Sequence, residues 1–281
     1  MKTGLILEGG AMRAMFTCGV IDVMLEHHIS FDGAIGVSAG ASFGCNYKSG
    51  QIGRPLRYNM KYCNDSRYCS IRSLITTGDL YNKEFCYNEV PLILDPFDID
   101  AYKANPMKFY IVCTDINTGK PVYHQYDGLE DHGLDWFRAS SSLPFVAKIV
   151  EIDGQKLLDG GISDPIPIRF MENQRYDKNI VILTQPQEYV KKKIGLMPLI
   201  RWKYKKYPKL IEALEHRHLL YNETISYICE QEALGKLLVI RPDCKLPVAR
   251  IEKNPHKLKE AYDIGRRIAS ARITEIIAFL K

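Results

Sequence analysis

A serine between two glycines is the first group in this sequence whose type and spacing suit chemistry. Gly36, Ser38 and Gly40 form a G-x-S-x-G pattern at the end of the apolar run 31–37, and a helix of small residues is expected from Ala39. A sharp strand-to-helix turn holds such a serine hydroxyl exposed, and the glycines let the chain pack closely. The pattern indicates a nucleophile, although an ordinary turn with a helix-capping serine has the same spacing.

An aspartate in a glycine-rich turn is the candidate base, because a serine hydroxyl needs a base to become nucleophilic at neutral pH. Asp159 follows the expected strand 156–158 and precedes Gly160 and Gly161, which permit close backbone approach. Partial desolvation would raise the basicity of the carboxylate, although a plain Asp-Gly turn is the simpler interpretation. The seven histidines do not stand in such a turn at a strand end: His27, His28, His124, His132, His216, His218 and His256.

A glycine pair near the amino terminus is the third element. The apolar run 3–7 is followed by Gly9, Gly10 and Ala11, and Arg13 comes two residues later. Backbone N–H groups of a loop between a strand and a helix can stabilise a developing oxyanion. A phosphate-binding turn is the alternative, but the dinucleotide fingerprint G-x-G-x-x-G is not met.

The three elements in this order resemble the patatin-like phospholipase family. The chain shows strand, G-G-x-x-R, helix, strand, G-x-S-x-G, helix and a later D-G-G, and the stretch R-A-S-S-S-L-P at 138–144 also resembles that family. The resemblance covers about residues 1–185. It implies a three-layer α/β/α fold with a mainly parallel central sheet, and acyl transfer through a Ser–Asp dyad and an acyl-enzyme intermediate.

The resemblance also implies a role for each motif residue. Ser38 would be the nucleophile and Asp159 the base, while the Gly9–Ala11 loop would form the oxyanion hole. Ala11 stands where the family has a third glycine. Arg13 would hold the loop or a phosphate, with a surface ion pair as the alternative. The glycines that would support the turns are Gly36, Gly40, Gly160 and Gly161. No metal or other cofactor is implied.

Alternatives from other classes remain open at this point. A Ser–His–Asp α/β-hydrolase or an acyltransferase would need one of the histidines close to Ser38. A non-catalytic lipid-binding module would keep the scaffold without the chemistry. Substitution of Asp159 compared with substitution of each histidine separates the first alternative, and a serine-reactive probe separates the second.

The elements that must position these residues follow the order of a parallel α/β sheet. Strands are expected at 3–7, 31–37, 108–115, 121–125, 146–152, 156–158, 179–184 and 237–241. Helices are expected at 14–28, from 39, at 85–94, at 134–140 and in one long terminal helix from 254 to 280, with 51–77 helical or irregular. At 281 residues, one large domain is expected. We assign 1–185 to the catalytic core and 186–281 to a basic segment, a last strand and C-terminal helices that pack on the same domain.

Positive charge is concentrated in one segment. The net charge is +5, yet eight basic residues and no acidic residue lie between 189 and 209, so the remainder carries −3. Nucleic acid is therefore not an expected partner. The basic residues alternate with Trp202, Tyr204 and Tyr207, which suits contact of 191–209 with an anionic membrane surface; a solvated loop is the alternative. A second basic stretch, 54–72, would lie with the first beside a lipid-facing opening of the proposed site.

The expected compartment follows from segments that the chain lacks, and the expected substrate is what the resemblance implies. The sequence contains no apolar run long enough to cross a bilayer and no clear signal peptide, and the eight cysteines lack metal-ligand spacing. We expect a cytoplasmic protein, which could also bind peripherally to a membrane. The expected substrate is a phospholipid or another lipid ester.

Overall fold

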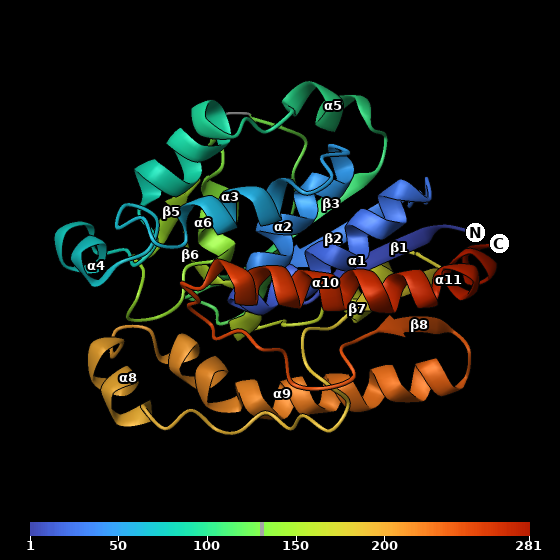
Figure 1. Cartoon of the computed structure of the whole chain (residues 1–281). Coiled ribbons are helices and arrows are strands. Elements are labelled where there is room, and N and C mark those ends of the chain that lie inside the picture. The colour runs from blue at the N-terminus through green and yellow to red at the C-terminus, as the bar shows by residue number, and fades with distance from the viewer. Residues whose placement is uncertain (130–131) are drawn as a thin grey trace.

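A mixed β-sheet between two layers of helices forms the centre of the protein, as a computed structural model of residues 1–129 and 132–281 shows (Figure 1). The strand order is β5-β6-β3-β2-β1-β7-β8, and β4 also pairs with β3. The strands are β1 (Thr3–Leu7), β2 (Gly33–Val37), β3 (Lys108–Asp115), β4 (Pro121–Gln125), β5 (Val150–Ile152), β6 (Gln155–Asp159), β7 (Lys178–Ile182) and β8 (Leu237–Ile240). The pairs β1–β2, β1–β7, β2–β3 and β7–β8 are parallel. The expected α/β/α fold with a mainly parallel sheet is thereby confirmed.

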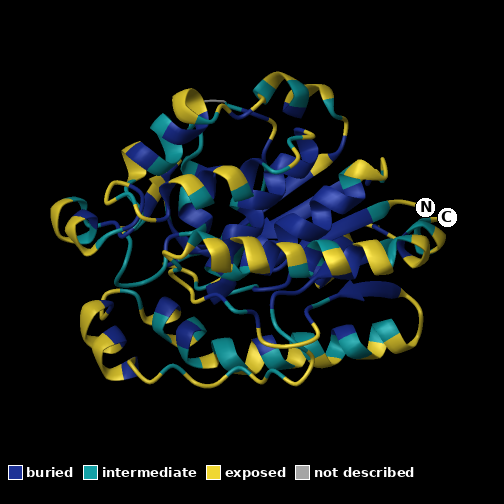
Figure 2. Cartoon of the chain, viewed as in Figure 1, coloured by how far each residue is buried: buried dark blue, intermediate teal, exposed yellow. Residues whose placement is uncertain are grey.

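The central strands are buried on both faces, as expected for a parallel sheet between helices (Figure 2). One face packs against α1 (Met15–Glu26), α2 (Ala39–Lys48) and α10 (Pro255–Ala271). The other face packs against α7 (Ile168–Asn173) and α9 (Pro208–Ala233). Side chains alternate accordingly along β1, where Leu5 and Leu7 join the first core and Ile6 joins the second.

Shorter elements connect and cover the sheet. They are η1 (Ala11–Ala14), α3 (Arg54–Tyr62), α4 (Ile71–Thr77), the π-helical η2 (Phe85–Leu94), α5 (Ile99–Ala104), α6 (Asp135–Ser140), η3 (Gly160–Ile162), α8 (Met197–Lys203) and α11 (Ile273–Leu280). The strand expected to begin at residue 146 begins at Val150 instead. The 26-residue α9 was not predicted from the sequence.

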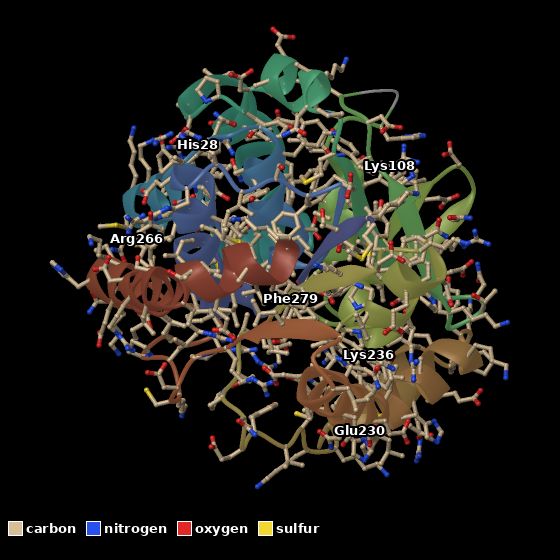
Figure 3. The ribbon with its side chains drawn as sticks, turned by 90° about the vertical axis from the view of Figure 1, so that its right-hand side faces the viewer. His28, Lys108, Glu230, Lys236, Arg266 and Phe279 are labelled. Atoms are coloured by element: carbon tan, nitrogen blue, oxygen red, sulfur yellow. The ribbon has the colours of Figure 1, made fainter. Side chains whose placement is uncertain are left out.

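The expectation of one long terminal helix is wrong, because the chain breaks at Arg272 between α10 and α11. The Arg272 side chain donates from Nη1 to the backbone oxygen of Val239 in the edge strand β8 and forms an ion pair with Glu275. Helix α11 then brings Phe279 to a hollow that Lys236 also lines (Figure 3). The beginning of α10 is as predicted, since Asn254 accepts from the backbone N–H of His256 at 2.9 Å.

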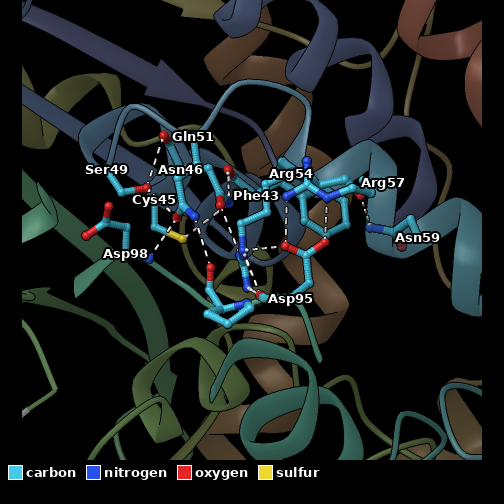
Figure 4. A network of polar contacts seen from close by, with 12 residues as sticks. Phe43, Cys45, Asn46, Ser49, Gln51, Arg54, Arg57, Asn59, Asp95 and Asp98 are labelled. Atoms are coloured by element: carbon cyan, nitrogen blue, oxygen red, sulfur yellow. Dashed lines mark hydrogen bonds and ion pairs between the residues drawn. The ribbon is translucent and has the colours of Figure 1, made fainter. Parts of the chain in front are cut away.

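A buried polar network fixes the far end of α2, the helix that begins directly after Ser38 (Figure 4). Arg54 donates from Nη1 to Oδ1 of Asn46 at 3.0 Å, and from Nε and Nη2 to the backbone oxygen of Asp95 at 3.0 and 2.6 Å. Arg57 binds the Asp95 carboxylate through two hydrogen bonds of 2.8 Å. These two charges of the 54–72 stretch therefore serve an internal network rather than a lipid-facing mouth.

Replacement of Arg54 with alanine should destabilise the protein by about 3 kcal/mol, because it leaves buried acceptors without a donor. The Arg54 side chain is 5% exposed, whereas Arg57, which pairs with the same aspartate, is 57% exposed. Arg57→Ala is the matched control and should cost less than about 1 kcal/mol. Urea unfolding of both variants measures the difference. Equal losses would show that the network at α2 does not depend on the buried guanidinium.

Candidate active site

The ends of β2 and β6 meet beside one strand, which brings two sequence motifs together. Strand β3 pairs with β2 as far as Val112, which faces Val37, and its next residue, Cys113, faces Asp159 of β6. Strand β4 occupies the other edge of β3 over Tyr110–Thr114, so β2 and β6 share one edge end to end. The residue that follows Val37 therefore lies next to the last residue of β6.

Ser38 is held in a strained turn at the start of α2. Its φ of 55° and ψ of −124° lie outside the regions that non-glycine residues favour. The backbone N–H of Ser38 donates to Oγ of Ser140 at 2.8 Å, and Ser140 donates to the backbone oxygen of Val112 at 2.6 Å. Such strain persists only where the surroundings fix it, and it is typical of functional sites.

The glycines around the two motifs permit the close approach of backbone segments. A Cβ at Gly36, Gly40 or Gly160 would lie 2.5, 2.4 or 2.2 Å from a backbone atom of Ala41, Leu7 or Val112. At Gly161, a Cβ would lie 3.0 Å from the carboxylate of Asp159. Any larger residue would separate these turns.

Asp159 lies buried beside Ser38, with 2% of its surface exposed. Its Oδ1 accepts from the N–H of Gly161 at 2.8 Å, and its own N–H donates to the backbone oxygen of Ser142 at 2.8 Å. Asp159 lines the same cavity as Ser38. Burial raises the pKa of Asp159, while the nearby Arg217 guanidinium, the Ser38 hydroxyl and the Gly161 amide act in the opposite direction. The result is a carboxylate more basic than an exposed aspartate, in the same cavity as a serine hydroxyl.

One short segment holds both of these residues in place. Ser140 binds the amide of Ser38, and Ser142 binds the amide of Asp159. Both belong to the R-A-S-S-S-L-P stretch at 138–144. The sequence singled out this stretch only as part of a resemblance; the contacts supply a physical reason for it.

The loop of Gly9, Gly10 and Ala11 lines the same small cavity, of about 70 Å³, as Ser38 and Asp159. Within the described part of the chain, the backbone N–H groups of these three residues have no acceptor. Ala11 has a φ of 49°, in the left-handed region that favours glycine, which agrees with its place in the motif. The loop therefore offers free donors to a group bound at Ser38.

A second cavity, of about 800 Å³, adjoins the first, and Ala11, Leu143 and Arg217 line both. Its apolar lining includes Leu80, Tyr81, Phe145, Val146, Ile162, Ile194, Leu196, Ile200 and Leu214. This cavity is large enough for a flexible apolar chain, and it opens beside the serine.

Arg13 also lines the small cavity, and it forms no ion pair within 4.0 Å among the residues that the structure describes. Its Nε is buried without an acceptor, and burial lowers its pKa. The surface ion pair considered for Arg13 from the sequence is therefore not what the structure shows.

None of the seven histidines, all of which are described, lines the cavity of Ser38. His124 stacks on Trp136, His132 pairs with Asp153, and His216 bonds to a carbonyl of its own helix. A Ser–His–Asp arrangement is thus not assembled. Over residues 1–129 and 132–281, no group of His, Cys, Asp and Glu side chains gathers in a way that could hold a metal ion.

Sequence reasoning missed several residues of the cavity. Glu8, buried to 3% exposure, accepts from the Tyr221 hydroxyl at 2.8 Å and from the N–H of Thr184 at 2.6 Å. Arg217 donates from Nε to the backbone oxygen of Gly161. Arg250 reaches the cavity from the segment after β8. The sequence feature that could have identified Arg217 is its position on the buried apolar face of α9. That face is formed by Leu210, Leu214, Tyr221 and Ile228.

At the level of class, this is an α/β protein with a serine-centred cavity at the carboxyl ends of its parallel strands. The chain belongs to the patatin-like phospholipase family, whose model matches residues 5–171. The resemblance inferred from the motifs is thereby confirmed, and with it the expectation of an enzyme of the lipid ester hydrolase class. A second model, described as a domain of unknown function (DUF6363), matches residues 207–281.

Similar proteins extend over different shares of this chain. The uncharacterized protein YjjU of Escherichia coli is 26% identical over 278 residues, covering 94% of this chain and 75% of that protein. An uncharacterized NTE family protein of Mycobacterium tuberculosis is 26% identical over 64% of this chain and 48% of its own length. Lysophospholipase nte1 of Aspergillus fumigatus is 27% identical over 60% of this chain and 11% of its own length. This chain thus spans about half of the second protein and about a tenth of the third.

Among solved structures, VipD from Legionella pneumophila aligns with a TM-score of 0.45 and 11% identity, covering 96% of this chain and 67% of VipD. No helix in the described part of this chain is long and apolar enough to cross a membrane.

Proposed function

We propose that this protein hydrolyses lipid esters through Ser38 and Asp159, with an acyl-enzyme intermediate. The observation that carries this proposal is that Ser38, on its strained turn, lines one small cavity with the buried Asp159 carboxylate, whose pKa is raised by burial. Geometry and basicity together suit a nucleophile and its base.

The reaction proceeds in two acyl transfers. Asp159 accepts the Ser38 proton while Oγ attacks the ester carbonyl carbon, and the N–H groups of Gly9, Gly10 and Ala11 stabilise the oxyanion. The bond to the alcohol then breaks, and the alcohol leaves with the proton from Asp159. Water attacks the acyl-enzyme with Asp159 again as the base, which releases the fatty acid and restores Ser38. The adjoining apolar cavity holds the acyl chain throughout.

The pH dependence follows from Asp159, because only its ionised form accepts the serine proton. Burial raises its pKa above the ordinary value of 3.8. Activity is therefore expected to fall with decreasing pH as Asp159 becomes protonated, and the fall should begin at higher pH than for an exposed aspartate.

The direct test is hydrolysis of soluble esters over a series of acyl-chain lengths, with the wild type beside Ser38→Ala. The proposal expects turnover by the wild type and a loss of at least about a thousandfold in kcat for the variant. Hydrolysis by folded Ser38→Ala at the wild-type rate would overturn the proposal.

Peripheral contact with an anionic membrane is the second part of the proposal. Apolar side chains are exposed on α4 and α8, where Ile75 is 78% and Trp202 is 74% exposed. Both helices lie at the left of Figure 1, and the segments next to them, with Leu80 and Ile194, line the large cavity. Three lysines follow the exposed tryptophan in the sequence: Lys203, Lys205 and Lys206. Apolar anchors among positive charges at the mouth of an apolar cavity suit an anionic lipid surface.

Neutralisation of Lys203, Lys205 and Lys206 to glutamine should weaken binding to anionic vesicles by about a hundredfold, at about 1 kcal/mol per lysine. Vesicle sedimentation at low and high salt measures the effect. The matched control replaces Lys108, Lys236 and Lys281, the first two of which lie at the opposite end of the molecule (Figure 3). Equal loss in both triple variants would mean that net charge, not the surface beside α8, determines binding.

A further inference from the structure

Positively charged side chains dominate the small cavity around Ser38. The four cationic residues that line it are Arg13, Lys191, Arg217 and Arg250. Its described lining also contains two carboxylates, those of Glu8 and Asp159. The cavity wall therefore carries more positive than negative charge beside the serine.

Both carboxylates already have hydrogen-bond donors. Glu8 accepts from Thr184, through its N–H and its hydroxyl at 2.6 and 3.0 Å, and from the Tyr221 hydroxyl at 2.8 Å. Asp159 accepts from the N–H of Gly161 at 2.8 Å, as described above. Among the described residues, none of the four cations lies within 4.0 Å of a carboxylate oxygen. None of the four cations therefore forms a close ion pair with these carboxylates, although Glu8 and Asp159 act on their charges from a longer distance.

The cationic side chains also have N–H groups that donate no hydrogen bond. Nε of Arg13 is buried without an acceptor. Arg217 uses Nε for the backbone oxygen of Gly161, and its Nη2 lies over that glycine, 3.3 Å from where a Cβ would be. Nζ of Lys191 lies 4.0 Å from the centre of the Tyr221 ring. The wall of the cavity therefore holds N–H donors that make no hydrogen bond to a described residue.

Burial and mutual repulsion make this arrangement costly without an anion. Burial, followed by the charge of Arg217, lowers the pKa of Lys191 to about 8. Burial is also the main cause that lowers the pKa of Arg13 and of Arg217, and Arg250 acts on both in the same direction. The charge of Glu8 on Arg13 and the charge of Asp159 on Arg217 act in the opposite direction. Such perturbed groups gathered in a cavity are typical of a functional site, and an anion bound among them would offset their repulsion.

The cations stand at the junction of the two cavities. Lys191, Arg217 and Arg250 line the apolar cavity as well as the small one. A ligand whose ester carbonyl lies at Ser38 and whose acyl chain fills the apolar cavity would place a nearby anionic group among these three residues. A guanidinium matches the geometry of phosphate oxygens and can donate two hydrogen bonds to them.

We propose that Lys191, Arg217 and Arg250 form a subsite for the phosphoryl group of the lipid ester, so that the enzyme prefers esters that carry a phosphate. The proposal rests on the proposed function, which leaves the headgroup open. All three residues lie beyond residue 171, where the match to the family model ends. Arg217 and Arg250 lie in the region 207–281, which matches a domain of unknown function. That region therefore takes part in substrate selection.

The first test compares a monoacylglycerol phosphate with the monoacylglycerol of the same chain in neutral detergent micelles. Wild-type kcat/KM should favour the phosphate ester, and Arg250→Gln and Lys191→Gln should each reduce that preference by about tenfold, the scale of one hydrogen bond to a charged group. Lys245→Gln is the matched control, because Lys245 is exposed and lies outside both cavities, and its substitution removes an equal charge. An unchanged preference in the Arg250 and Lys191 variants would overturn the subsite.

The second test does not depend on hydrolysis, so it separates the subsite from the proposed function. Ser38→Ala should bind dodecyl phosphate in calorimetry, and addition of Arg250→Gln should weaken this binding by about tenfold. Equal binding with and without Arg250 would contradict the subsite even if the enzyme proved active. If inorganic phosphate bound as tightly as dodecyl phosphate, the site would serve free phosphate and the lipid assignment would be wrong. Loss of ester hydrolysis with dodecyl phosphate binding intact would reject the proposed function and keep the subsite.

Discussion

Replacement of Asp159 with asparagine should lower kcat for ester hydrolysis by about a thousandfold or more, the scale of a lost general base. Asparagine keeps the size of the side chain and an oxygen that can accept from the amide of Gly161. Because burial raises the pKa of Asp159, the ionised carboxylate costs folding free energy at neutral pH, and the substitution should leave the Tm unchanged or higher. A loss of activity without a loss of stability is the signature of a catalytic rather than a structural role.

Asp164→Asn is the matched control for this result. Burial also raises the pKa of Asp164, to about 6, but its carboxylate accepts from the Tyr123 hydroxyl at 2.7 Å and does not line the cavity of Ser38. This variant should keep its activity. If Asp159→Asn remained active while a histidine substitution removed activity, a Ser–His–Asp mechanism would replace the dyad.

Replacement of Gly9 with alanine should lower kcat by about a hundredfold, the scale of one lost oxyanion-hole donor. A Cβ at Gly9 would lie 2.8 Å from the backbone oxygen of Val37 and 3.1 Å from Cβ of Ser38. The loop must therefore move away from the serine, and its amides would no longer reach the oxyanion. Because the donors act on the transition state, kcat should fall more than KM rises.

Gly195→Ala is the matched control, because a Cβ there has no neighbour within 4 Å and its φ is not positive. With a soluble ester, this variant should behave as the wild type. Thermal unfolding of both variants shows whether Gly9→Ala still folds. A folded Gly9→Ala with wild-type kcat would mean that the 9–11 loop does not stabilise the oxyanion.

The parts of the fold and of the site that could be predicted from the sequence depend on residues that are close together in the chain. At the glycines beside Ser38 and Asp159, a Cβ would lie only 2.2–2.5 Å from a backbone atom of another segment, so only glycine fits and the motifs stand out in the chain. The apolar runs that became β1, β3 and β7 are buried on both faces and have the composition of central parallel strands. Such features need no knowledge of distant partners.

The parts that sequence did not predict depend on contacts between distant segments. Arg217 and Arg250 reach the site only because α9 packs across the sheet and the chain after β8 returns beside η1, where the N–H of Met12 bonds to the Arg250 carbonyl. The break at Arg272 depends likewise on the free edge of β8. The apolar stripe of α9 marks Arg217 as facing the core, but the residues next to Arg217, Arg250 and Arg272 in the sequence do not show which segment each one contacts.

The central claim, that Ser38 becomes acylated with Asp159 as its base, is tested most directly by covalent trapping with a fluorophosphonate. Mass spectrometry of the digested protein should find a single adduct on the peptide that contains Ser38, with labelling at least about a hundredfold slower in Asp159→Asn. An adduct on another residue, or labelling of the folded protein that does not depend on Ser38, would contradict the account.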